Sequence, residues 1–476
     1  MTARASHWAA VALTLAVIAI STHQTLTRYR EFRSGFSWDL AYYNQWFWAV
    51  TRGDRVITVR PLAAYAQEGP SVWKMNYLAP IRFALVPIYG LFPDPRTLLV
   101  IQNAIFWCVV AAAYTLVRSE SQSEGIALSA ALLTVLTPLF WPLAWNDFRE
   151  LQLGVPFVLW GIQGWRTRKH GLATFGIAGM LACRQEYGLL VALFALVPPR
   201  HPDAPGRRQA WIWSALIVGV GWFALVFLAY LSRQVGSHAP AEYLVQLTGT
   251  RAPIGETVAS VLEFLFIGLG SFAVLALFAP RIALVAAPLV WSLCSGQWGF
   301  RTMETVHWHH VRYAAPVTAL LVAAGLIGYA RASGLLSTRF QSRWVLVSFS
   351  AFVAVGLVAS NVVLQHRFAR VPRPITESEA DRLWVWIHEV APDDGVLAAY
   401  EVAAPLSSRR LLYSYRLDEN KPAGYPRLAP EIRWAFVREG EVPPQLFTYQ
   451  GFIDMDAGPA IRVFRRNGDQ SIGSPP

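Results

Sequence analysis

Apolar residues gather in long runs separated by short polar connections. A transmembrane helix needs about 20 mostly apolar residues, so the pattern predicts an all-α polytopic membrane protein with about eleven transmembrane helices. The first run, 8–26, lacks a small-residue cleavage site after it, so we predict a span rather than a signal peptide. The other runs lie at 95–117, 124–144, 151–166, 171–183, 187–198, 209–232, 257–279, 281–298, 311–330 and 344–364.

The charges of the connections set the predicted orientation. If the N-terminus is cytoplasmic, every second connection is inside, and each of these is basic, as the positive-inside rule requires. This arrangement predicts a multi-pass protein of the plasma (inner) membrane. The basic connections contain Arg118; Arg166, Arg168 and Lys169; Arg200, Arg207 and Arg208; Arg281; and Arg331, Arg339 and Arg343.

The first outer loop, 29–94, is rich in aromatic residues and holds two amphipathic stretches, 38–52 and 78–92. The second stretch is short for a span and contains Pro80 and Pro87. We therefore expect both stretches to be helices at the outer membrane interface rather than across the bilayer.

Beyond the last apolar run the chain changes character, because charges, prolines and strand-like alternation appear. We predict a transmembrane domain over 1–365 and a small extracytoplasmic α/β domain over 366–466. The last residues, 467–476, are expected to be a disordered tail. Within the α/β domain, the pattern predicts a helix over 377–391, capped by Thr376, and strands at 396–400, 411–415, 433–437 and 461–465.

Composition narrows the class further. Hydrophobic residues make up 54% and charged residues 15% of the 476 residues, against about 25% charged residues in soluble domains. This excludes a soluble globular, disordered or coiled-coil protein. The net charge of +11 is explained by the basic residues of the predicted inside connections, so it gives no reason to expect a nucleic-acid partner. The three cysteines lie in apolar runs, and no nucleotide-binding or zinc-protease motif occurs, so neither disulfides nor a zinc site is expected.

The predicted topology places several polar groups at the outer face. Asp39 opens the first amphipathic stretch, and its plain interpretation is an acid that stabilises a helix N-terminus. Arg184 and Glu186 interrupt an apolar stretch, and their plain interpretation is a local ion pair at a turn. Further groups follow at Asn146, Asp147, Arg149 and Glu150, and at Glu304, His307, His309, His310 and Arg312. The histidines are more typical of interfacial contacts than of metal ligands.

Several of these residues fall in segments that resemble a bacterial family of membrane proteins of unknown function, which is grouped with the GT-C superfamily of glycosyltransferases. The resemblance covers nearly the whole chain. Ala41 replaces a usual glycine, and Tyr77 and Arg149 stand where histidine is usual. The segments are Asp39–Trp48, Tyr77–Pro80, Leu98–Gln102, Asp147–Glu150, Arg184–Glu186 and His310–Pro316.

The resemblance implies a GT-C-like fold and transfer of a sugar from a polyprenyl-phosphate-linked donor to a lipid or glycan acceptor at the outer face. It implies that Asp39 is the catalytic base or organises the donor site. Arginine suits the carrier phosphate, so Arg184 and Arg312, together with His310, are the candidate donor-binding residues. The supporting candidates are Gln45, Asp147, Glu150, Glu186 and His307.

Two alternatives remain at this stage. One is a transporter or lipid flippase, although charges at one membrane face and the lack of an evident repeat are unusual for that class. The other is a non-catalytic protein that binds membrane lipids, with the C-terminal domain as its working part. No motif requires a cofactor, and a divalent metal ion remains open.

Overall fold

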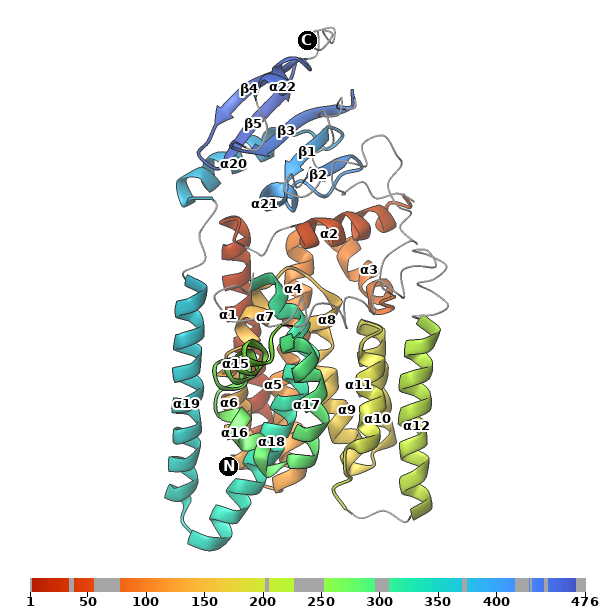
Figure 1. Cartoon of the computed structure of the whole chain (residues 1–476), viewed down its shortest axis with the longest axis vertical. Coiled ribbons are helices and arrows are strands. Elements are labelled where there is room, and N and C mark those ends of the chain that lie inside the picture. Colours follow the sequence, from red (N-terminus) through yellow and green to blue (C-terminus); the bar gives the residue numbers. More distant parts are fainter. Residues whose placement is uncertain are drawn as a thin grey trace.

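The computed structural model shows a helical bundle with a five-stranded sheet beyond one of its ends (Figure 1). The N-terminus lies at the other end of the bundle, and α2 and α3 lie between the bundle and the sheet. The structure describes residues 2–33, 38–54, 78–201, 205–226, 252–295, 308–369, 375–415, 428, 430–440 and 444–467.

The helices follow the predicted apolar runs, and several runs are broken into shorter pieces. The run 124–144, for example, forms two helices, and 257–279 forms four short helical segments. The helices before the sheet are α1 (Ala3–Arg30), α2 (Trp38–Thr51), α3 (Ile81–Leu91), α4 (Pro95–Phe106), α5 (Cys108–Ser121), α6 (Glu124–Val135), α7 (Phe140–Trp145), α8 (Glu150–Leu153), α9 (Val155–Thr167), α10 (His170–Cys183), α11 (Tyr187–Leu193), η2 (Phe194–Leu196), α12 (Pro205–Ala224), α15 (Ile254–Glu263), η4 (Phe264–Leu269), α16 (Ser271–Leu275), η5 (Ala276–Phe278), α17 (Pro280–Ser295), η6 (Trp308–Ala314), α18 (Ala315–Phe340) and α19 (Arg343–Ala369).

Within the described residues, four helical segments are long and apolar enough to cross a membrane. They are Ala3–Arg30, Pro95–Ser121, Val311–Phe340 and Arg343–Arg367. A fifth span results if Ile254–Leu269 and Ser271–Phe278 act together, although they are bent by 103°. The bend falls at Gly270, whose φ of +57° is a conformation that favours glycine. The predicted count of about eleven spans thus remains a prediction.

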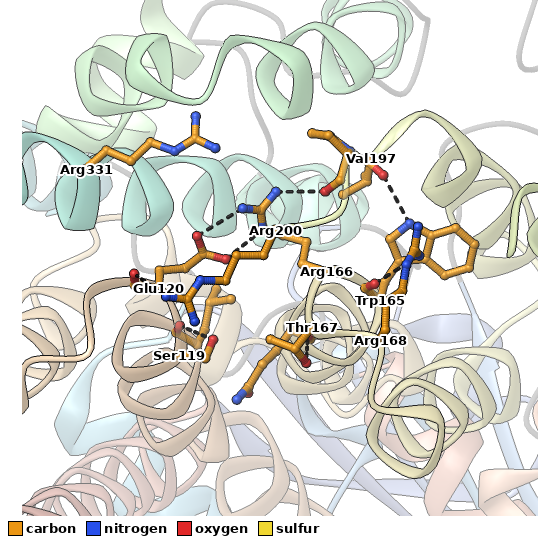
Figure 2. A network of polar contacts seen from close by, with 12 residues as sticks. Ser119, Glu120, Trp165, Arg166, Thr167, Arg168, Val197, Arg200 and Arg331 are labelled. Carbon is orange, nitrogen blue, oxygen red and sulfur yellow. Dashed lines mark hydrogen bonds and ion pairs between the residues drawn. The ribbon is translucent and has the colours of Figure 1, made fainter. Parts of the chain in front are cut away.

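A polar network at the N-terminal end of the bundle joins α5, α9 and the segment after η2 (Figure 2). Both carboxylate oxygens of Glu120 accept hydrogen bonds from Arg166, at 2.8 and 2.9 Å. Arg166 also donates to the carbonyl of Pro198 at 2.8 Å, and the Arg200 backbone N–H donates to the carbonyl of Arg166 at 2.8 Å. The basic residues predicted for the inside connections therefore also fix this end of the bundle.

The sheet belongs to an α/β unit with strand order β2-β1-β3-β5-β4. β2 (Leu412–Tyr415), β1 (Gly395–Ala399) and β3 (Ile432–Arg438) are parallel, whereas β5 (Ile461–Arg466) and β4 (Phe452–Ala457) continue antiparallel. The helices of this unit are α20 (Glu377–Glu389), α21 (Tyr400–Ala403) and α22 (Gln445–Thr448).

Successive side chains along a strand point to opposite faces of the sheet, and each face packs in its own buried cluster. Val396 and Trp434 share one buried cluster with Leu383 of α20, while Leu397 and Phe447 belong to a second cluster. The Thr376 hydroxyl accepts a hydrogen bond from the Glu379 N–H, as the predicted N-cap requires. The four predicted strands correspond to β1, β2, β3 and β5, and β4 is an additional strand that the sequence analysis did not include.

The α/β unit is docked onto α1 and α2. The Trp384 indole N–H donates to the carbonyl of Arg30 at 2.8 Å, and its ring stacks on Phe32. On α2, the Asn44 amide donates to Ser407 Oγ at 2.8 Å, and the Gln45 amide donates to the carbonyl of Arg409 at 3.1 Å. The helix that begins near Asp39 is therefore held directly by the C-terminal unit.

Candidate functional site

Asp39 lies in the first turn of α2 and is enclosed by two arginines. Arg149 donates from Nε to Asp39 Oδ2 at 2.9 Å and also contacts Oδ1 through Nη2. Arg312 of η6 forms an ion pair with Oδ2 through Nη1. All three side chains are at least nine-tenths buried. Asp39 is therefore more than a helix N-terminal acid, because it joins three separate segments of the chain.

A second buried ion pair lies beside the first. Glu150 contacts Arg82 of α3 through Oε1 and accepts a hydrogen bond from the Tyr43 hydroxyl through Oε2 at 2.9 Å. Arg82 and Arg149 both lie against the Tyr43 ring, at 5.1 and 5.8 Å from its centroid. Tyr43 therefore connects the two ion pairs, and α2 contributes to both of them.

The segment between α7 and α8 is fixed by Gln102 of α4. The Gln102 amide donates to the carbonyl of Asn146 at 2.8 Å, and its oxygen accepts from the Arg149 N–H at 2.9 Å. The Asn146 side chain in turn accepts from the Asp147 N–H at 2.9 Å. Gln102 is the last residue of the Leu98–Gln102 segment of the resemblance. Its hydrogen bonds hold the backbone of Asn146 and Arg149 in place.

Asp147 lies next to Asp39 and is buried, with 1% of its surface exposed. The Leu40 N–H donates a hydrogen bond to it. Its Oδ1 atom has no hydrogen-bond partner among the described residues. Burial, followed by the nearby charge of Asp39, raises the pKa of the Asp147 carboxyl well above its usual range, against the lowering effect of Arg312 and Arg149.

Arg184 and Glu186 form the local ion pair that the plain interpretation predicts, with Nη2 and Oε1 2.9 Å apart. Arg184 is almost fully buried, whereas Glu186 is partly exposed. Burial raises the pKa of Tyr43, and the charge of Arg184 is one of those that oppose this rise, so this turn lies near the Tyr43 cluster. Gln185 between them is fully buried, and its amide has no hydrogen-bond partner within the described part of the chain.

The remaining candidates do not all lie in this cluster. The Gln45 amide donates hydrogen bonds to the backbone carbonyls of Arg409 and Arg410 in the C-terminal unit. His307 lies outside the described residues, and for His310 the structure describes only the backbone, in η6. The structure thus brings together Asp39, Arg312, Asp147 and Glu150, with Arg184 and Glu186 close by.

Two residues of the cluster, Arg82 and Tyr43, were not among the sequence candidates. Arg82 lies between apolar neighbours in α3, and a lone charge in an apolar helix is a signal that would have found it. Tyr43 stands four residues after Asp39, which is the spacing of one helix face. Aromatic and apolar residues are abundant in the segment 29–94, so neither residue stood out there.

The charges of the cluster favour an anion over a metal ion. The three guanidinium groups of Arg82, Arg149 and Arg312 surround two paired carboxylates, those of Asp39 and Glu150. The third carboxyl, that of Asp147, has a raised pKa, which favours its neutral form and leaves an excess of positive charge. No group of three or more His, Cys, Asp or Glu in the described ranges could hold a metal ion. With two arginines on Asp39, this carboxylate does not suit a divalent cation.

Comparison with known proteins gives a family and a fold. The family described as "Predicted membrane protein (DUF2079)" matches residues 29–438. The crystal structure of ArnT from Cupriavidus metallidurans bound to undecaprenyl phosphate matches with a TM-score of 0.55 at 14% identity, over 98% of this chain and 99% of that one. The apo structure of the same protein matches with a TM-score of 0.55 at 13% identity, over 100% of both chains. No curated protein matches in sequence.

Proposed function

The chain belongs to the DUF2079 family of membrane proteins and has the GT-C-like fold of ArnT, and from this premise we propose that it is a membrane glycosyltransferase. It moves a sugar from a polyprenyl-phosphate donor to a lipid or glycan acceptor at the outer face of the membrane. The observation that carries this proposal is the buried arginine cluster around Asp39. ArnT was crystallised with undecaprenyl phosphate, a ligand of the class that this cluster suits.

Arg149 and Arg312 are the groups that would hold the carrier phosphate, and Arg184 is a further candidate. A guanidinium forms paired, charge-assisted hydrogen bonds with phosphate oxygens and stays protonated. During transfer, the acceptor oxygen bonds to the anomeric carbon, and the bond from that carbon to the phosphate oxygen breaks. The electron pair stays with the phosphate, where the arginines stabilise the added charge. Such preorganised stabilisation is often the largest contribution to catalysis.

The arrangement in the membrane is part of the proposal. The N-terminus is cytoplasmic and the C-terminal unit is extracytoplasmic, with about eleven spans between them. In Figure 1, α2 and α3 lie beneath the sheet, at the end opposite the N-terminus. In the proposed orientation this end of the bundle is the outer one, where a lipid-linked donor and an acceptor from outside meet. The surrounding aromatic and apolar side chains would limit hydrolysis of the donor by water.

One feature favours a transporter instead. The bent pair Ile254–Leu269 and Ser271–Phe278 resembles the broken helices that bind substrates in many transporters. Such sites lie near the middle of the membrane, whereas the helices that carry Asp39 and Arg82 lie toward one end of the bundle. We therefore keep transport as the second candidate function.

Binding of the carrier lipid to the purified protein in nanodiscs provides the test. Native mass spectrometry should show that undecaprenyl phosphate binds in preference to undecaprenol, which lacks the phosphate. Arg312→Gln should lose this preference, while Arg331→Gln, at the other end of the bundle, should keep it. Equal binding of both lipids would contradict the proposal. A profile of lipid-linked sugars in cells with and without the gene would then identify the donor, and an unchanged profile would favour transport or simple lipid binding.

A further inference from the structure

The contacts of Asp39 conflict with the role of proton acceptor that the resemblance implies. Both of its carboxylate oxygens already contact guanidinium groups, Oδ1 from Arg149 and Oδ2 from Arg149 and Arg312. A carboxylate whose charge is balanced by two guanidinium groups is stabilised in its ionised form, which makes it a poor acceptor for a hydroxyl proton. Asp39 is better suited to holding the two arginines in position for a phosphate.

Asp147 has the opposite environment. Its Oδ1 atom is buried and has no hydrogen-bond partner among the described residues. A buried polar atom without a partner is costly, and a catalytic role is one of the recognised reasons why a protein keeps one. The groups that face Asp147 are Asp39 and the Leu40 N–H from α2, Arg312 from η6, and Arg149 from its own segment. The hydrogen bonds of Gln102 hold that segment in place.

We propose that Asp147, rather than Asp39, is the catalytic residue that accepts the proton of the acceptor hydroxyl, an inference that rests on the proposed glycosyl transfer. As the acceptor oxygen bonds to the anomeric carbon, its proton moves to Asp147 Oδ1. The bond between the anomeric carbon and the phosphate oxygen breaks, and the phosphate leaves with the electron pair. Asp147 then releases the proton to water. Asp39 is a positioning residue that acts through Arg149 and Arg312.

The electrostatics of the cluster support this assignment. Burial and the neighbouring Asp39 raise the pKa of Asp147 well above that of an ordinary aspartate. A base is most effective when its pKa lies near the working pH. Because only the ionised carboxylate accepts a proton, the transfer rate should rise as the pH rises through this pKa. If the base were an aspartate with an ordinary pKa, it would already be ionised at these pH values, and the transfer rate would not change with pH.

The first experiment follows the proton itself and needs no substrate. Infrared spectra of the protein in nanodiscs, recorded across a pH titration, should show a carboxylic acid band that persists above the range of ordinary aspartates. Asp147→Asn should remove the band, and Asp381→Asn, which changes an exposed residue of α20, should leave it. A wild-type protein without this band, or a band that survives in Asp147→Asn, would overturn the inference.

The second experiment measures transfer with the donor that the lipid profile identifies. Asp147→Asn should lower the rate by about 10²–10⁴-fold and remove the rise with pH, while undecaprenyl phosphate still binds. Asp147→Glu should keep a pH-dependent rate with a shifted midpoint. If wild type transfers sugar and Asp147→Asn does so equally well with the same pH profile, this inference fails and the proposed function stands. If wild type transfers no sugar, both fail.

Discussion

Arg312 and Asp39 are 273 positions apart in the chain and form a buried ion pair. The pair connects η6, which leads into the long helix α18, with the first turn of α2. Arg149 completes the contact from the segment before α8. Three parts of the chain that are distant in sequence thus meet at one carboxylate, and changes at this point should affect both the fold and the binding of an anion.

We predict that Asp39→Asn destabilises the protein by about 3–5 kcal/mol, because it leaves two buried guanidinium groups without their shared partner. This exceeds the roughly 0.3–1 kcal/mol expected for an acid that only interacts with a helix dipole. Unfolding of the purified protein in detergent would measure the loss. Adding Arg312→Gln should recover part of it, and the exposed Asp381→Asn should cause no change. A small loss in Asp39→Asn alone would support the helix-dipole interpretation.

The pair of Arg82 and Glu150 should behave as a unit. Arg82→Met leaves a charged carboxylate in a fully buried position, and we expect a loss of about 3–5 kcal/mol. Adding Glu150→Gln removes that charge and still offers an oxygen to the Tyr43 hydroxyl, so most of the stability should return. The same unfolding measurement on the two single variants and the double variant gives the coupling energy. Additive losses would show that the two residues do not depend on each other.

The sequence was sufficient to predict elements that depend on local pattern. The helix at Trp38–Thr51, the cap at Thr376 and four of the five strands follow from apolar spacing and capping residues. The strand β4, Phe452–Ala457, was not predicted, although apolar and acidic residues alternate from Ile453 onward, because aspartate is depleted in strands.

The candidate site was predictable only in part, because its contacts are formed over long sequence separations. Asp39, Asp147 and Arg312 stood out as charges at the ends of apolar runs. The sequence did not show which charges pair with each other, because the partners are far apart in the chain. Arg82 and Glu150 are separated by 68 positions, and Arg149 and Asp39 by 110. Gln45 was assigned to the site through the resemblance, yet its side chain points to the C-terminal unit. Periodicity fixes the face of a helix but not which of its neighbours each face will meet.

The C-terminal unit should loosen when its contacts with α2 are removed. Asn44 donates to Ser407 and Ser408, and its oxygen accepts from the Tyr89 hydroxyl at 2.7 Å. We expect Asn44→Ala, combined with Gln45→Ala, to increase hydrogen exchange at the backbone amides of 404–411. Thr51→Ala, at the exposed far end of α2, is the matched control and should leave exchange unchanged. Equal protection in all variants would mean that the contacts with α1 hold the unit unaided.

The orientation can be tested by labelling single cysteines in intact cells, in a background without the three native cysteines. A cysteine at the exposed position Asp393, in the α/β unit, should react with a membrane-impermeant reagent added from outside. A cysteine at the exposed position Gln341, between α18 and α19, should react only after the membrane is permeabilised. The opposite pattern, or labelling of both from outside, would contradict the proposed cytoplasmic N-terminus.

Variants of Arg184 and Glu186 can distinguish two roles of Arg184, a local ion pair with Glu186 and the binding of the lipid phosphate. Arg184 is almost fully buried, and Glu186 is its partner at 2.9 Å, so either single change to glutamine should lower stability. Changing both should restore stability, because no unbalanced charge remains. Binding of undecaprenyl phosphate should stay weak in the double variant, and also in Arg184→Lys, because an ammonium group does not reproduce the planar fork of arginine. If the double variant recovers binding together with stability, Arg184 only balances Glu186, and Arg149 and Arg312 remain as the phosphate ligands.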